Sequence, residues 1–211
     1  MTKIYEVNIN ETGRQIKELS SGDSFKISQM IFNLKDQLIK ASLALTMFER
    51  SQISTDPFIA SLPFSYQIHL HLLYAHAFIF ALDEIDKTMS VLESPEKMPN
   101  IPLNARLQLT KARLDLSTLI PGIKSVRDSA HHVEDRIRLK GNHEKKILPQ
   151  PVTIPGLFTH QGDVLMVSCL IDNRLSYTAG DGSLQMIEIS ETVLKHAQSV
   201  VQKVFDGFEW F

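Results

Sequence analysis

The sequence of 211 residues is short of cysteine and of net charge, and each shortage excludes a class of protein. Its single cysteine, Cys169, excludes an internal disulfide and a zinc site built from several thiolates, and it suits a reducing compartment such as the cytoplasm. The formal net charge is −2, so no overall positive field favours nucleic acid as the partner. A hydrophobic fraction of 43% and a charged fraction of 22% are those of a globular chain, which excludes a disordered one.

Charged residues are missing between Asp56 and Asp83, a stretch long enough to be tested as a membrane span. It contains two prolines and three histidines, and its continuous apolar part is only Leu72–Leu82. A span needs about 20 apolar residues, and the acidic flank that follows gives no positive-inside signal. The N-terminus also lacks the pattern of a secretory signal. We therefore expect a buried core helix in a cytoplasmic protein without membrane association.

Four segments carry apolar residues at the spacing of helices that bury one face, at about residues 24–50, 63–92, 103–119 and 121–140. Prolines separate the second from the third, and Pro121 suits the first turn of the fourth. Short connections between them predict an antiparallel up-and-down bundle over residues 23–146. Before it, residues 1–22 form an N-terminal extension in which residues 5–9 alternate as a half-buried strand.

The remaining residues, 147–211, have a different character. Their first part is rich in proline and is expected to be an extended link. Strand-like runs follow, separated by turn residues, at 163–171, 174–178 and 184–189. They predict a small antiparallel β meander, and an amphipathic helix over 191–205 follows it with Ser190 as its N-cap. The sequence thus predicts a mainly α fold with a helical bundle and a β-containing tail, whose C-terminal aromatic residues dock on the core: Phe205, Phe208, Trp210 and Phe211.

The histidines of the second helix do not have the spacing of a metal site. His69 and His71 point about 160° apart on a helix, and His69 and His76 lie about 10 Å apart along its axis. One ion cannot bind either pair. We expect buried or boundary histidines here, and neither a metal nor a cofactor in this chain.

Residues 125–146 concentrate the titratable side chains. Paired histidines and carboxylates in this segment come just before a cationic run that contains Arg136, Arg138, Lys140, Lys145 and Lys146. One interpretation of the run is a helix C-terminus, which favours cations because of the helix dipole. The other is a rim that binds the phosphates of a nucleic acid.

Arg127 and His132, with Asp128 after the arginine, fit an R-x4-H pattern, and over about residues 24–146 the chain resembles the HEPN superfamily. Members are helical bundles with an arginine and, four to six positions on, a histidine on a late helix. Many are metal-independent endoribonucleases that act as homodimers. The resemblance implies a toxin or defence ribonuclease in which the RNA 2′-OH attacks the phosphate. It implies that Arg127 holds that phosphate, that His132 moves the proton, and that Asp128 orients His132.

Two other interpretations stay open. Non-catalytic HEPN members are dimerisation or binding modules for a protein or nucleotide partner, such as a nucleotidyltransferase or an antitoxin. The carboxylates beside Arg127 favour this non-catalytic interpretation, because they repel phosphate. A third possibility is an unrelated small-molecule binder with a pocket between the bundle and the meander. Residues five apart on a helix differ by about 140°, so His131 remains an alternative to His132 as the functional histidine.

Overall fold

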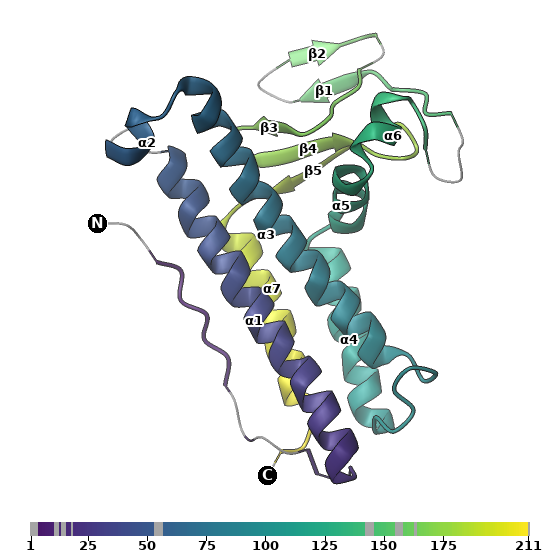
Figure 1. Ribbon diagram of the computed structural model, residues 1–211. Helices are drawn as coiled ribbons and strands as arrows, with labels where there is room; N and C mark the ends of the chain where they lie inside the picture. The colour runs from purple at the N-terminus through teal and green to yellow at the C-terminus, as the bar shows by residue number, and fades with distance from the viewer. Residues whose placement is uncertain are drawn as a thin grey trace.

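The computed structural model describes residues 4–10, 13, 16–17, 19–52, 57–141, 146–154, 158–162 and 164–210, which form a helical bundle with two small sheets at one end (Figure 1). The helices are α1 (Ser21–Gln52), α2 (Pro57–Ser61), α3 (Phe64–Glu93), α4 (Leu103–Leu119), α5 (Ile123–His131), α6 (Val133–Ile137) and α7 (Glu191–Asp206). The strands are β1 (Val152–Ile154), β2 (Phe158–His160), β3 (Cys169–Ile171), β4 (Arg174–Thr178) and β5 (Leu184–Glu188). The prediction of a mainly helical chain with an antiparallel meander is confirmed.

Four long helices form a closed ring. α1 packs on α3, α3 on α4, α4 on α7 and α7 again on α1, and neighbours in the ring run in opposite directions (Figure 1). A single hydrophobic core fills the ring and includes Phe48, Phe78 and Phe205. The ring crosses the predicted boundary at residue 146, because α7, which was expected to belong to the tail, is one of the four bundle helices.

Short polar residues and prolines set the ends of these helices. At the start of α1, the Ser20 hydroxyl accepts a hydrogen bond from the Asp23 backbone N–H (3.2 Å) and donates to its carboxylate (2.8 Å). Pro63 and Pro102 precede α3 and α4, whose first N–H groups need no partner within the helix. Ser190 caps α7 by accepting from the Val193 N–H at 3.3 Å, as predicted.

The charge-free stretch forms most of α3. By length and composition this helix could cross a membrane, since an 18-residue window reaches a mean hydropathy of 1.2. In the bundle, its C-terminal half is buried against α1 and α4, with Phe78, Ile79 and Leu82 fully inaccessible to solvent. The prediction of a buried core helix therefore holds for the C-terminal half of α3 and is wrong for its N-terminal half, where Phe64, Tyr66 and Leu73 are exposed.

The N-terminal segment contradicts its strand prediction. Residues 4–10 pair with no strand and instead lie along α1 and α7. The Tyr5 hydroxyl donates to Glu49, the Ser42 hydroxyl donates to the Tyr5 carbonyl, and the Asn10 N–H donates to Gln202 Oε1 at 2.9 Å. The predicted alternation of buried and exposed side chains is still present over residues 4–10. An extended chain that lies on helices also buries every second residue, so the alternation does not require a sheet.

The β region also differs in detail. β3, β4 and β5 form the predicted meander, but the run expected at 163–171 is a strand only over β3. β1, within the proline-rich residues 148–156 that were expected to be an extended link, pairs with β2, for which no element was predicted. The turn between β4 and β5 needs Gly182, whose φ is +89° and where an added Cβ would lie 2.1 Å from the Leu148 carbonyl oxygen.

The C-terminal aromatic residues dock on the core, as predicted. Phe205, Phe208 and Trp210 are all buried, and Trp210 stacks on Phe205 with ring centroids 5.9 Å apart. The Trp210 indole N–H donates to the Phe205 carbonyl at 2.9 Å. Phe211 lies outside the described residues.

Candidate functional site

The helix that carries the R-x4-H pattern is broken at its histidine. One helix was predicted to continue to residue 140, but α5 ends at His131 and α6 begins at Val133, with His132 between them at φ −111° and ψ 40°. The break turns α6 so that Val133 packs against the core and the Arg136 side chain points inward. The two ends of the R-x4-H pattern therefore do not lie on one continuous helix.

Arg127 lies at the junction of α3 and α5 and contacts two carboxylates. Its Nε is 3.0 Å from Asp83 Oδ1, and its Nη1 is 2.8 Å from Asp128 Oδ1. The Nε–H does not point at an acceptor, so the contact with Asp83 is an ion pair rather than an aligned hydrogen bond. Arg127 is 19% exposed and Asp83 only 2%, so this charge pair belongs to the protein interior more than to its surface.

Asp83 has a second cation beside it. Lys87 Nζ lies 2.8 Å from Asp83 Oδ2, one turn along α3, and also 2.6 Å from Glu84. Hydrogen bonds to Asp83 and Glu84 raise the pKa of Lys87, so it keeps its charge. A buried carboxylate is thereby compensated from both sides, by Lys87 within α3 and by Arg127 from α5.

The two histidines of the motif have different surroundings. The His131 ring stacks on Phe80 of α3, with centroids 4.8 Å apart and planes at 24°. Phe80 and Asp83 are three residues apart on α3, so Arg127 and His131 face the same side of that helix. The His132 side chain is 59% exposed, with Asp135 Oδ2 3.5 Å from its Nδ1. Asp128, which was expected to orient His132, pairs with Arg127 instead.

The structure separates the predicted nucleic-acid-binding residues into two kinds. Arg138, Lys140 and Lys146 are exposed, and Lys145 lies outside the described residues. Arg136 is only 3% exposed; its Nη1 donates to the Lys140 carbonyl at 2.8 Å and its Nε to Ser129 Oγ at 3.3 Å. The prediction that Arg136 contacts a phosphate does not fit this placement, because its side chain is enclosed and its Nε and Nη1 donate within the protein.

A second polar cluster, which the sequence does not predict, joins α3 to the meander. His76 Nε2 lies 2.6 Å from the Tyr177 hydroxyl and 3.4 Å from Ser168 Oγ. Burial lowers the pKa of His76 and raises that of Tyr177, so both groups are neutral near pH 7. Tyr177 and Ser168 lie 101 and 92 residues from His76 in the sequence, so no local pattern around His76 predicts these contacts.

This cluster predicts a pH dependence of stability. Because folding lowers the pKa of His76 from 6.5, the unfolded chain binds the proton more tightly, and stability is lost as the pH falls below about 6.5. We expect the loss in free energy of unfolding between about pH 7.5 and about pH 5.5 to be smaller in His76→Gln than in the unsubstituted protein. Urea unfolding at both pH values measures it. The control is His69→Gln, at an exposed histidine of the same helix, which should lose as much free energy of unfolding as the unsubstituted protein. An equal loss in the unsubstituted protein and in both variants would contradict the prediction.

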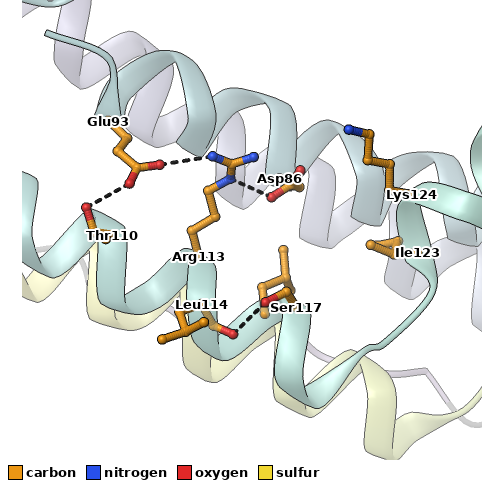
Figure 2. Close-up of a pocket in the computed structure, with 9 residues that line it drawn as sticks. Asp86, Glu93, Thr110, Arg113, Leu114, Ser117, Ile123 and Lys124 are labelled. Carbon is orange, nitrogen blue, oxygen red and sulfur yellow. Dashed lines mark hydrogen bonds and ion pairs between the residues drawn. The ribbon is translucent and has the colours of Figure 1, made fainter.

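Among the hollows lined by described residues, two of about 300 Å³ or more lie apart from Arg127. The first, of about 340 Å³, lies between α3, α4 and the start of α5 (Figure 2). In it Arg113 donates to Asp86 (2.9 Å) and Glu93 (3.0 Å), while the Lys124 ammonium projects from the rim (Figure 2). Its charged floor is therefore largely paired within the protein.

The second hollow, of about 300 Å³, lies where α4 and α7 meet β4 and β5. Its lining is mostly apolar, with Arg174 and Glu188 at directly opposite positions of β4 and β5. This is the place where a pocket between bundle and meander was expected. Both volumes are at the lower end of the range for small-molecule sites, about 300–1,000 Å³, and neither hollow is lined by Arg127 or His132.

The described residues contain no group of three histidine, cysteine or acidic side chains that could hold a metal ion. No protein-family model, no curated protein and no solved structure matches the chain. The resemblance to the HEPN superfamily therefore stays a prediction from the sequence.

Proposed function

We propose that the chain is a non-catalytic, HEPN-like helical module that binds a partner, and that Arg127 serves to stabilise the junction of α3 and α5. The observation that carries this proposal is the engagement of Arg127 with two carboxylates, one of them 2% exposed. An arginine that holds a reacting phosphate needs its guanidinium fork turned toward the substrate. Here Nε and Nη1 already face Asp83 and Asp128.

The energetics also favour a structural role. A phosphate that replaced Asp83 at Arg127 would leave a buried carboxylate with Lys87 as its only cation, and removing one partner of a buried pair is strongly destabilising. A phosphate placed beside both carboxylates would be repelled by them instead. Neither arrangement stabilises the extra charge of a transition state, which is what a catalytic arginine must do.

One specific observation favours a second candidate, the metal-independent ribonuclease. Arg127 and His131 share a face of α5 and contact α3 residues only three positions apart, Asp83 and Phe80. In this candidate, Arg127 would exchange Asp128 for the phosphate, and His131 would transfer the proton near neutral pH. The functional histidine would then be His131, which stacks on Phe80, and not His132.

A cleavage assay separates the two candidates. The purified chain is incubated with a labelled single-stranded RNA in EDTA, beside a mock preparation from cells without the gene. The proposal predicts no cleavage above the mock and no difference for Arg127→Lys, His131→Ala or His132→Ala. Cleavage that falls about 100-fold in Arg127→Lys and His131→Ala, but not in His132→Ala, would establish the ribonuclease and overturn the proposal. The expected homodimer is checked on the same preparation by light scattering.

A further inference from the structure

Three cationic residues that the structure describes after α6 form a group that we call the basic cluster: Arg138, Lys140 and Lys146. α6 ends at Ile137, Leu139 adopts a left-handed conformation with φ 57°, and Lys140 then forms an antiparallel bridge with Lys146. All three cationic side chains are exposed. The bridge places the backbones of Lys140 and Lys146 side by side.

Buried Arg136 holds the backbone of the basic cluster at Lys140. Its Nη1 donates to the Lys140 carbonyl, while the Lys140 N–H donates to the Asp135 carbonyl at 2.7 Å. On the other side, the Ile147 N–H donates to the Leu139 carbonyl at 2.7 Å, and Ile147 is buried. The backbone at Lys140 and Lys146 is therefore set by hydrogen bonds on both sides of the bridge.

The bridge places two like charges directly opposite one another. Opposed residues of an antiparallel pair have Cα atoms about 4.5–5.5 Å apart and side chains on the same face. Like charges in this arrangement are destabilising. Elsewhere the cations Lys87, Arg113 and Lys203 each pair with a carboxylate. Within the part of the chain that the structure describes, no carboxylate forms an ion pair with Arg138, Lys140 or Lys146.

We propose that Lys140 and Lys146 form a clamp for the phosphates of a single-stranded nucleic acid, with Arg138 beside them and Arg136 as a positioning residue. This inference rests on the proposed binding function and names the partner. An anion between the two ammonium groups replaces their repulsion by attraction, and the backbone supplies such anions in series. Two exposed lysines held side by side suit a continuous strand, whereas a single small anion is more often held in an enclosed cavity.

The first measurement is binding of fluorescently labelled 12-nucleotide RNA and DNA strands to the full chain by anisotropy, over a range of salt. The test variant is Lys146→Glu, and the matched control is Lys97→Glu, the same charge change at an exposed lysine in the loop between α3 and α4. Lys146→Glu is expected to weaken binding about tenfold or more and to reduce the salt slope by about 0.7, the value for the one phosphate that lies between the two lysines. Lys97→Glu should stay within about twofold. Equal binding by both variants, or an acidic peptide that competes as well as the nucleic acid, would overturn the proposal.

The second measurement is thermal unfolding without nucleic acid. Lys146→Glu turns a repulsive cross-strand pair into an attractive one, so its midpoint at low salt should rise above that of the unsubstituted protein. The rise should shrink at high salt. A midpoint of thermal unfolding that does not rise would contradict the placement of the Lys140 and Lys146 charges opposite one another. If Lys146→Glu does not fold, Lys146→Gln removes the repulsion with half the change in charge, and the same two measurements apply.

The role of Arg136 is tested by Arg136→Lys, which keeps the charge but cannot make both hydrogen bonds. It should weaken binding severalfold while the salt slope stays unchanged, because no phosphate contact is lost. A slope reduced by about 0.7 would make Arg136 a contact residue and overturn its positioning role. The outcomes for this inference and for the proposed function are distinguishable. RNA cleavage that depends on Arg127 would overturn the proposed function alone. Nucleic-acid binding that Lys146→Glu leaves unchanged would overturn this inference alone.

Discussion

Arg127→Ala is expected to destabilise the protein by about 3 kcal/mol, the lower end of the cost of removing one partner from a buried ion pair. The substitution leaves Asp83, which is 2% exposed, with Lys87 as its only cation. The cost stays at the lower end because Lys87 remains and because Arg127 itself is 19% exposed. Urea unfolding followed by circular dichroism measures the change in free energy of unfolding.

Two further variants show whether the loss comes from the uncompensated carboxylate. The double variant Asp83→Leu with Arg127→Met replaces the pair by apolar groups and should recover most of the stability. His132→Ala, at a side chain that is 59% exposed, should change stability by less than about 0.5 kcal/mol. An Arg127→Ala protein as stable as the His132→Ala control would show that the pair contributes nothing, and would reopen a catalytic role for Arg127.

A fragment of residues 21–146, which contains the bundle that the sequence predicts, is expected not to fold. It lacks α7, whose Val200, Val201, Val204 and Phe205 are at most 2% exposed in the intact ring. Burial of each such side chain stabilises a fold by about 1.5–3 kcal/mol, and a whole domain is stable by only about 5–15 kcal/mol. Circular dichroism should show no cooperative thermal transition for the fragment.

A point variant tests the same conclusion in the full chain. Val201→Asp places an unpaired charge between α7 and the rest of the ring and should abolish cooperative unfolding. Ser199→Asp, at an exposed position of the same helix, is the matched control and should leave the transition in place. A fragment of residues 21–146 with a sharp transition would contradict the four-helix ring.

The sequence predicts the long helices well because their signals are local. Apolar spacing and flanking prolines place the ends of α1, α3 and α4 within three residues of their observed positions. The sequence does not predict which helices pack together, since an amphipathic helix such as α7 can cover any apolar face. Its assignment to a tail followed from the intervening strands, which suggest a separate unit but add no core large enough to be one.

The site was harder to predict because its contacts are not local. The proximity of Arg127 and Asp83 depends on how α5 packs on α3, and that of His76 and Tyr177 on how α3 meets β4. The run from Arg136 to Lys146 shows the same limit. A count of cations does not reveal that Arg136 is buried beneath the others. The reading that carboxylates beside Arg127 oppose a phosphate role was available from the sequence, and the ion pairs support it.

The closed ring also has a kinetic consequence. α1 and α3 meet through a short connection, but the contacts of α1 with α7 join segments about 140 to 185 residues apart in the chain. Proteins dominated by such non-local contacts fold more slowly than bundles built from sequential helix pairs. During synthesis, α1, α3 and α4 leave the ribosome with one apolar face uncovered until α7 follows. The nascent three-helix intermediate is thus the aggregation-prone species, and chaperone binding should be strongest before α7 emerges.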